Sequence, residues 1–283
     1  MKVIITAKEN TASINMFKVF TEELGFEKTD KEFDGNAVYK KDDFVLVTSN
    51  GNVIPIEHVC EFPDFKENPP EIYIVASSHK STTAMKTLSC HTPGNWQNAD
   101  MGGSPKELCL GHALFLRNML KELRKYPDER YEKCFEVTHH GPSDMNAPTM
   151  FVEVGGSEEE WNDMEAIRFA CKCMLSADDD DKNSKGEPVA VAVGFGGPHY
   201  APVFSRDEYV DNVAVAHILP KYNIDGIDEQ TVLQAFEKTV PKTKLAVLEW
   251  KGLSGADKEI LKRIFEKNNI EWKKLKDFKG EQM

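Results

Sequence analysis

Short apolar runs recur along the whole chain, and most of them are rich in β-branched residues. Such runs predict β-strands, which fall at residues 3–7, 71–77, 133–138, 150–155, 188–197, 213–219, 244–250 and 270–275. Residues 37–49 predict a hairpin or two short strands. The chain is therefore expected to contain strands from one end to the other.

Helical patterns fill the intervals between these runs. They predict helices over residues 11–24, 104–126, 157–176, 228–238 and 254–268. Gly25 is placed to end the first helix. Ser104 and Pro105 fit the opening positions of the second. Ser157 and Glu160 have the spacing of a capping box for the third.

The alternation of strands and helices indicates the fold class. It is typical of an α/β protein in which helices cover a largely parallel sheet. Residues 178–187, DDDDKNSKGE, have no pattern and predict an exposed acidic loop, yet the strands on both sides fit a single sheet. We therefore expect one domain over residues 1–283, with this loop as an insertion.

The composition is typical of a soluble globular protein, with 40% hydrophobic and 29% charged residues. No apolar stretch approaches the roughly 20 residues that a bilayer-spanning helix needs. The apolar run in MKVIITAKEN, at the N-terminus, is too short for a signal peptide. The six cysteines form no CxxC pair and are expected to be reduced thiols. We expect a cytoplasmic protein without membrane contact.

Charge is distributed unevenly along the chain. The net charge of −12 argues against nucleic-acid binding through bulk charge. Residues 157–187 alone hold ten acidic and four basic residues. Two stretches are basic instead, residues 117–133 and residues 262–279. Either stretch fits a solvated helix surface, and either can form a local basic face.

Several histidines follow the ends of predicted strands. They are His79, His139, His140 and His199, and His91 lies in the unusual segment CHTPGNW (90–96). In an open α/β sheet, ligands bind beyond the carboxyl ends of strands. One histidine at such a place is more often structural, but several on one rim are hard to explain by packing. We therefore predict a functional site built from imidazoles.

Two kinds of chemistry fit these imidazoles. Neutral imidazoles and a carboxylate can bind zinc, and a catalytic zinc site keeps one position for water. The residues available for one or two ions are His79, His91, His139, His140, His199, Asp144 and Glu153. No HExxH spacing is present. The other chemistry is metal-free general-base catalysis, with oxyanion donors from the backbone of the glycines at 194–197.

Six longer motifs give the chain a resemblance to a known family. They are SSHKS (77–81), HTPGN (91–95), THHGP (138–142), FVEVG (151–155), GFGGPHY (194–200) and HILPKY (217–222). With them the chain resembles the archaeal and plant type of D-aminoacyl-tRNA deacylase, also called D-tyrosyl-tRNA deacylase. The resemblance implies hydrolysis of the ester between a D-amino acid and tRNA, with release of both.

The resemblance also carries expectations about fold and cofactor. It implies a three-layer α/β/α sandwich with a mostly parallel mixed sheet, related to the phosphorylase and peptidyl-tRNA hydrolase group. It implies zinc dependence, with about two ions per chain. The expected partner is tRNA charged with a D-amino acid, contacted through the basic stretches, and no obligate protein partner is evident.

Roles follow for individual residues. We predict that His139, His140 and His199 are catalytic, by binding metal or activating water. The predicted metal ligands, chosen by spacing and residue type, are His79, His91, His139, His140, Glu153 and His199. The predicted substrate-binding residues are Lys80, Gly141, Gly196, Gly197 and Tyr200. Lys80 is expected to contact phosphate, and Tyr200 to stack on the terminal adenine or donate to the ester oxygen.

Three other hypotheses about the function stay open at this point. A zinc-dependent exopeptidase or amidase on a related α/β fold would use the same histidines without binding tRNA. A non-catalytic RNA-binding module would bind RNA in a salt-dependent way and would not need His139, although the negative net charge counts against it. The third hypothesis is that the histidines have a structural role only and cap the ends of strands.

Overall fold

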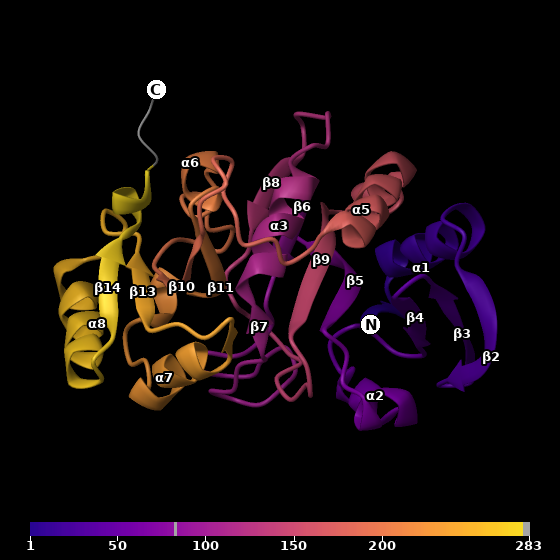
Figure 1. Ribbon diagram of the computed structural model, residues 1–283, viewed down its shortest axis with the longest axis horizontal. Coiled ribbons are helices and arrows are strands. Elements are labelled where there is room, and N and C mark those ends of the chain that lie inside the picture. The colour runs from indigo at the N-terminus through magenta and orange to yellow at the C-terminus, as the bar shows by residue number, and fades with distance from the viewer. Residues whose placement is uncertain (82–83, 280–283) are drawn as a thin grey trace.

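Figure 1 shows a computed structural model of the chain, which describes residues 1–81 and 84–279. The strands are β1 (Lys2–Ala7), β2 (Glu27–Phe33), β3 (Asn36–Lys41), β4 (Phe44–Ser49), β5 (Ile72–Lys80), β6 (Thr87–His91), β7 (Gly111–His112), β8 (Glu132–Phe135), β9 (Thr149–Gly156), β10 (Ala190–Phe195), β11 (Val213–Leu219), β12 (Thr239–Val240), β13 (Leu245–Leu248) and β14 (Glu271–Lys274). The expected strands are all present, within a few residues of their predicted bounds.

Helices lie between these strands. The α-helices are α1 (Thr11–Lys18), α2 (Pro63–Glu67), α3 (Ala113–Leu123), α4 (Glu158–Trp161), α5 (Met164–Ser176), α6 (Asp207–Val210), α7 (Glu229–Glu237) and α8 (Gly255–Lys267). Shorter or irregular turns are η1 (Val19–Glu23), η2 (Glu57–Glu61), η3 (Lys221–Asn223) and η4 (Leu275–Phe278). The first helix ends as expected, because Gly25 follows it with a φ of 74°.

The strands form a large mixed sheet, a smaller parallel one and a two-stranded parallel pair of β7 and β12. The first has the order β2-β3-β4-β1-β5-β9-β6-β8, and the second has the order β11-β10-β13-β14. We expected a single sheet, but the pairing is interrupted after β8. Backbone hydrogen bonds join the halves after β8, from Val137 N to His199 O (2.9 Å) and from Thr138 N to Ile218 O (3.1 Å). The segment that follows β8 therefore links both sheets.

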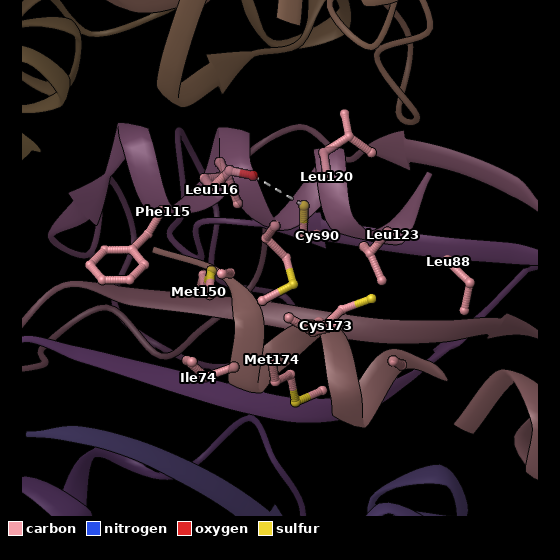
Figure 2. Close-up of a cluster of buried hydrophobic side chains, with 14 of the residues drawn as sticks. Ile74, Leu88, Cys90, Phe115, Leu116, Leu120, Leu123, Met150, Cys173 and Met174 are labelled. Carbon is pink, nitrogen blue, oxygen red and sulfur yellow. Dashed lines mark hydrogen bonds between the residues drawn. The ribbon is translucent and has the colours of Figure 1, made fainter. Parts of the chain in front are cut away.

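Helices cover both faces of the strand layer, so the three-layer α/β/α sandwich is confirmed (Figure 1). Helices α1, α3 and α5 bury their apolar residues on one face. Figure 2 shows Leu116 and Leu120 of α3 and Cys173 of α5 in one cluster with Ile74 of β5 and Met150 of β9. On the other face, α2 covers the large sheet, and α7 and α8 cover the small one.

The predicted helix 104–126 was wrong in its first part, since α3 begins only at Ala113. Residues 104–110 instead pair with a distant loop: Asn95 N donates to Glu107 O (2.8 Å), and Cys109 N donates to Pro93 O (3.2 Å). The real N-cap is His112, whose Nδ1 accepts from Phe115 N. Tertiary pairing therefore overrides a helical pattern that is local to the sequence.

The predicted helix 157–176 is two helices. Ser157 and Glu160 form the expected capping box at the start of α4. Asp163 then starts α5, because its carboxylate accepts from the N–H groups of Glu165 and Ala166. The pattern gave no sign of β2, β6, α2 or α6.

The acidic loop is exposed, as predicted, but it is also anchored. Asn118 of α3 donates to the backbone oxygens of Asp178 and Asp180, and the buried Arg117 donates to Lys182 O. All six cysteines are free and buried, as expected for reduced thiols. Among the described residues, no helix is both long and apolar enough to cross a bilayer.

Candidate active site

A cavity of about 590 Å³ opens where β5 and β9 end and where the chain leaves β8 and β10. This volume is in the range of pockets that enclose small-molecule ligands. The predicted site residues in its lining are His79, Lys80, His139, His140, Glu153, His199 and Tyr200. Residues predicted from separate strand ends therefore meet at one place.

Strand register places the first of these side chains. Glu153 of β9 lies between Ser77 of β5 and Ser89 of β6, and Gly155, two residues on, lies between His79 and Thr87. A Cβ atom on Gly155 would lie 1.9 Å from Thr87 Oγ1 and 3.1 Å from His79 Cβ. Because Gly155 has no side chain, β9 can lie close to Thr87 of β6 and to His79 of β5.

The centre of the site is Glu136, a residue that the sequence analysis missed. Its carboxylate is 1% exposed and accepts from Ser89 Oγ (2.5 Å) through Oε1. Its Oε2 lies 2.8 Å from His199 Nε2, 3.1 Å from His79 Nδ1 and 3.5 Å from His139 Nε2. Like Glu153, it is a carboxylate inside an apolar run, and that signal would have found it.

The protonation state of Glu136 follows from these contacts. Burial acts to raise the pKa of Glu136, but hydrogen bonds from His199 and His79 outweigh it and hold the pKa well below its usual range. Glu136 is therefore a buried carboxylate at neutral pH.

Backbone carbonyls set the tautomers of the paired histidines. His139 Nδ1 lies 2.8 Å from Val137 O, and His140 Nδ1 lies 2.6 Å from Gly141 O. A carbonyl can only accept, so both Nδ1 atoms carry the proton. Burial and the neighbouring His140 also lower the pKa of His139 well below its usual value, so its ring is neutral. Its Nε2 therefore presents a lone pair to Glu136.

His91 completes a second group beside the first. Its Nε2 lies 3.2 Å from His140 Nε2, and its buried Nδ1 has no hydrogen-bond partner. Burial and the adjacent His139 and His140 lower the pKa of His91 well below its usual value. His140 reaches this position with a φ of 47°, in the left-handed region that non-glycine residues seldom adopt.

These atoms have the arrangement of a metal site. A lone pair of His139 faces a carboxylate oxygen, which is an unfavourable contact unless a cation lies between them. The lone pair of His140 faces His91 Nε2, which can donate to it or share a cation with it. Tetrahedral zinc with bonds of 2.0–2.1 Å has ligand atoms about 3.3 Å apart, close to the distances seen here. The residues therefore fit zinc. Val137 O and Gly141 O accept from the Nδ1–H groups, and such acceptors usually hold ligating histidines in place.

Three overlapping groups have ligand atoms within 4.8 Å of one another. The groups are His79–Glu136–His139–His199, His91–His139–His140 and His91–Glu136–Glu153. Together they contain all six residues predicted as metal ligands, with Glu136 added.

His79 is held differently from the other rings. Burial acts to lower the pKa of His79, but hydrogen bonds to Glu136 and Glu153 outweigh it and raise the pKa to about 11. With only protein groups around it, His79 is an imidazolium between two carboxylates. Its Nε2 lies 3.1 Å from the hydroxyl of Tyr200, which brings that side chain to the cavity wall.

The structure does not bring every predicted residue into the cavity. Gly141 packs against the backbone of Gly102 and Gly103 instead, where a Cβ would lie 2.4 Å from Gly103 N. Gly196 and Gly197 face Glu249 and Leu253, and Gly196 N already donates to Leu219 O. Asp144 is exposed outside the cavity lining. The prediction of oxyanion donors at Gly196 is thus wrong, because its N–H is occupied.

The α/β/α fold thus carries a cavity lined by histidines and the buried Glu153, residue types with which hydrolases activate water. The comparisons with known proteins make the class specific. The profile of the D-aminoacyl-tRNA deacylase family matches residues 66–273. The chain belongs to this family.

Individual relatives agree over nearly the whole chain. The D-aminoacyl-tRNA deacylase of Thermococcus onnurineus is 34% identical over 96% of this chain and 99% of its own. That of Methanocaldococcus jannaschii is 33% identical over 82% of this chain and 99% of its own. Among solved structures, a conserved protein of unknown function superposes with a TM-score of 0.85 at 28% identity, over 98% of this chain and 96% of its own.

Proposed function

We propose that this chain hydrolyses the ester bond of D-aminoacyl-tRNA and releases a free D-amino acid and tRNA. Family membership over nearly the full length supports the reaction class. The observation that carries the proposal is the convergence of His79, His139 and His199 on one cavity around Glu136. These three histidines come from three of the motifs that first suggested the family.

We propose zinc as the cofactor. Bound zinc would lower the pKa of a water toward about 7, so that hydroxide is available at neutral pH. Glu136, His139 and His199 would hold one ion, and His91 and His140 would contribute to a second. His139 can give its Nε2 to one ion only, because its Nδ1 is bound to Val137 O. With two ions per chain, His139 would therefore bind only one of them.

The chain's own residues would orient the reaction. Ser89 and the neighbouring imidazoles fix the carboxylate of Glu136. His199 has the most exposed ring around it, with 33% of the side chain accessible against 21% for His139 and 11% for His79. If His199 acts as the acid or base and not as a ligand, this exposure places its ring to exchange a proton with the leaving ribose oxygen.

Substrate contacts are proposed for two further residues. Lys80 is exposed at the end of β5 on the cavity lining, where it can meet a phosphate of the terminal nucleotides. Tyr200 is half-buried and presents its ring beside His79 and His199, so it can stack on the terminal adenine. Six reduced cysteines and a tRNA substrate both suit a cytoplasmic enzyme.

The test is release of amino acid from D-Tyr-tRNA and from L-Tyr-tRNA, with and without a chelator. We expect hydrolysis of the D-form only, lost on chelation and restored by zinc. D-selective hydrolysis that survives chelation would leave the reaction and remove the catalytic metal. Hydrolysis of neither ester would contradict the proposal. It would favour the alternative hypothesis of an exopeptidase or amidase, which no comparison supports.

Matched variants sharpen this test. His139→Ala and His199→Ala should each abolish most of the D-selective activity. His58→Ala is the control, because His58 pairs with Asp34 on the surface, outside the cavity lining. Equal activity in all three variants would exclude the histidine cluster as the catalytic site.

A further inference from the structure

Aromatic and basic side chains of the C-terminal part of the chain lie together. They belong to the end of the molecule that β13, β14 and α8 form (Figure 1). Trp250 stacks on Trp272 of β14, with ring centroids 5.6 Å apart and planes 3° apart. Lys258 and Lys274 each place Nζ 4.6 Å from the centroid of Trp250, and Lys262 lies at 5.4 Å. Ammonium groups therefore surround a paired indole platform.

A groove of about 600 Å³ adjoins this platform and shares Trp250 with it. Its basic lining residues come from the start of α6, the turn after β13 and the C-terminal η4. We define the C-terminal basic surface as Arg206, Lys251, Lys258, Lys262, Lys274, Lys276 and Lys279.

Most of this charge is not neutralised within the described residues. Only Lys262 and Lys279 form ion pairs, with Glu259 at 3.5 Å and with Glu208 at 3.0 Å. The lysines over Trp250 are held by the negative face of the ring, which fixes an ammonium without cancelling its charge. The groove has one carboxylate, Glu249, and its pKa is raised by burial.

The other basic stretch, residues 117–133, is different because most of its cations form ion pairs with carboxylates of the same chain. Lys121 pairs with Asp211, Arg124 with Asp207, Lys125 with Glu122 and Arg130 with Asp128. Arg117 is buried, and Lys133 donates to a backbone oxygen. Two stretches that look alike in sequence thus differ in the charge that they offer to a partner.

The groove is connected to the loop that carries His199 through Glu249, which lines the groove and packs against Gly197. Arg206 follows His199 by only seven residues. On the other side of the groove, Glu249 packs against Gly197, where a Cβ would lie 2.8 Å from Glu249 Oε2. A polyanion bound along the groove would therefore reach the loop that carries His199.

We propose that the C-terminal basic surface, and not the stretch 117–133, binds the phosphate backbone of the tRNA acceptor arm. Unpaired Lys and Arg side chains bind nucleic acid by releasing its counterions, and an aromatic platform adds stacking for an unpaired base. This surface supplies both, on a chain whose overall charge repels RNA. The inference rests on the proposed deacylase function.

The test compares two triple variants that remove the same charge. Lys251→Gln/Lys274→Gln/Lys276→Gln changes the C-terminal basic surface, and Lys121→Gln/Lys125→Gln/Arg130→Gln is the matched control. Binding of uncharged tRNA is measured between 50 and 200 mM salt, about the range in which such contacts weaken most visibly. Thermal melts verify that both proteins are folded.

We expect the surface variant to bind tRNA at least about tenfold more weakly, with a salt dependence shallower by roughly 2 to 3 in log–log slope. Its KM for D-Tyr-tRNA should rise while kcat stays close to that of the unmodified chain. Equal affinity of the two triples, or greater loss in the control, would overturn the inference. An unmodified chain that binds tRNA through this surface but hydrolyses no charged tRNA would refute the proposed function alone.

Discussion

At the scale of single residues, the site depends on atoms that would repel one another in isolation. His139 is neutral and directs a lone pair at the carboxylate of Glu136, 3.5 Å away. A cation bound between the two groups would turn this contact into an attractive one. The site is therefore set by the orientation of each donor as much as by its identity.

Glu136→Gln tests this residue directly, because it keeps the shape of the side chain and removes its charge. We expect kcat/KM for D-Tyr-tRNA to fall by about 10²- to 10⁴-fold, together with zinc affinity. Ser89→Ala removes only the hydrogen bond to Oε1 and should cost about tenfold. A Glu136→Gln protein with normal zinc content and rate would show that the carboxylate charge is not used.

Gly155→Ala tests the close approach of the strands at His79. The added Cβ would overlap Thr87 Oγ1, so β6 or His79 must move, at a cost of about 1–3 kcal/mol. We expect a lower unfolding midpoint in urea and a reduced rate. Gly51→Ala, which has open space around the new Cβ, should change neither. Adding Thr87→Ala should recover part of the loss, and no recovery would contradict a clash at this contact.

At the scale of elements, local signals predicted what local interactions decide. The capping box at Ser157 and Glu160 was visible in the sequence because both of its hydrogen bonds lie within four residues. The start of α3 was not visible, because residues 104–110 pair with a loop that lies more than ten positions away. The strand β6 was missed for the same reason, since its neighbours β8 and β9 supply its pairing.

Glu160 gives a pH prediction for the α4 cap. Burial acts to raise the pKa of Glu160, but Lys86 (2.6 Å) and Ser157 outweigh it and lower the pKa below the ordinary 4.5. The carboxylate therefore stabilises the fold above pH 4.5, and that contribution is lost as the pH falls through the lower, folded-state pKa.

The corresponding measurement is urea unfolding of Glu160→Gln against the unmodified chain as a function of pH. We expect the variant to be less stable by about 1–3 kcal/mol at neutral pH, with the difference disappearing as the pH falls below 4.5. Glu159→Gln removes the same charge from an exposed neighbour that also contacts Lys86, and it should have little effect. A difference for Glu160→Gln that is constant with pH would contradict the assignment.

At the scale of the whole molecule, the site lies where the two sheets meet. Val137 and Thr138 bond to the backbone of His199 and Ile218, so the histidines of both halves are held in register by the same segment. A cation shared by Glu136, His139 and His199 would connect the large sheet to the loop after β10. Metal binding is thus expected to stabilise the assembled fold as well as the reaction.

Metal removal tests this coupling. We expect about two zinc ions per chain by elemental analysis, and a lower melting temperature after dialysis against a chelator. Zinc at 100 times its Kd should restore about 2.7 kcal/mol of stability per site. Magnesium is the control, because imidazole sites discriminate against it. A melting temperature that ignores zinc, together with less than one ion per chain, would contradict a metal centre here.

The sequence by itself determined the alternation of strands and helices, the family, and the histidines of the site. These are properties of local patterns and of motifs that stay contiguous in the chain. All six predicted ligands lie in one cluster of side chains, and five of them line the cavity, with His91 buried behind it. The sequence likewise showed two basic stretches, but not which one is free to bind a partner.

Only the tertiary structure decided which carboxylate lies at the centre, where α3 begins, and what the glycines do. Ser89 and Glu136 are 47 positions apart, and Arg124 and Asp207 are 83 apart, so no local pattern contains either pair. Gly196 and Gly197 were predicted as substrate contacts, and only the tertiary structure shows that Glu249 lies against both. The physical reason is that periodicity reports which face of an element is buried, whereas pairing between distant side chains is fixed only when the layers close.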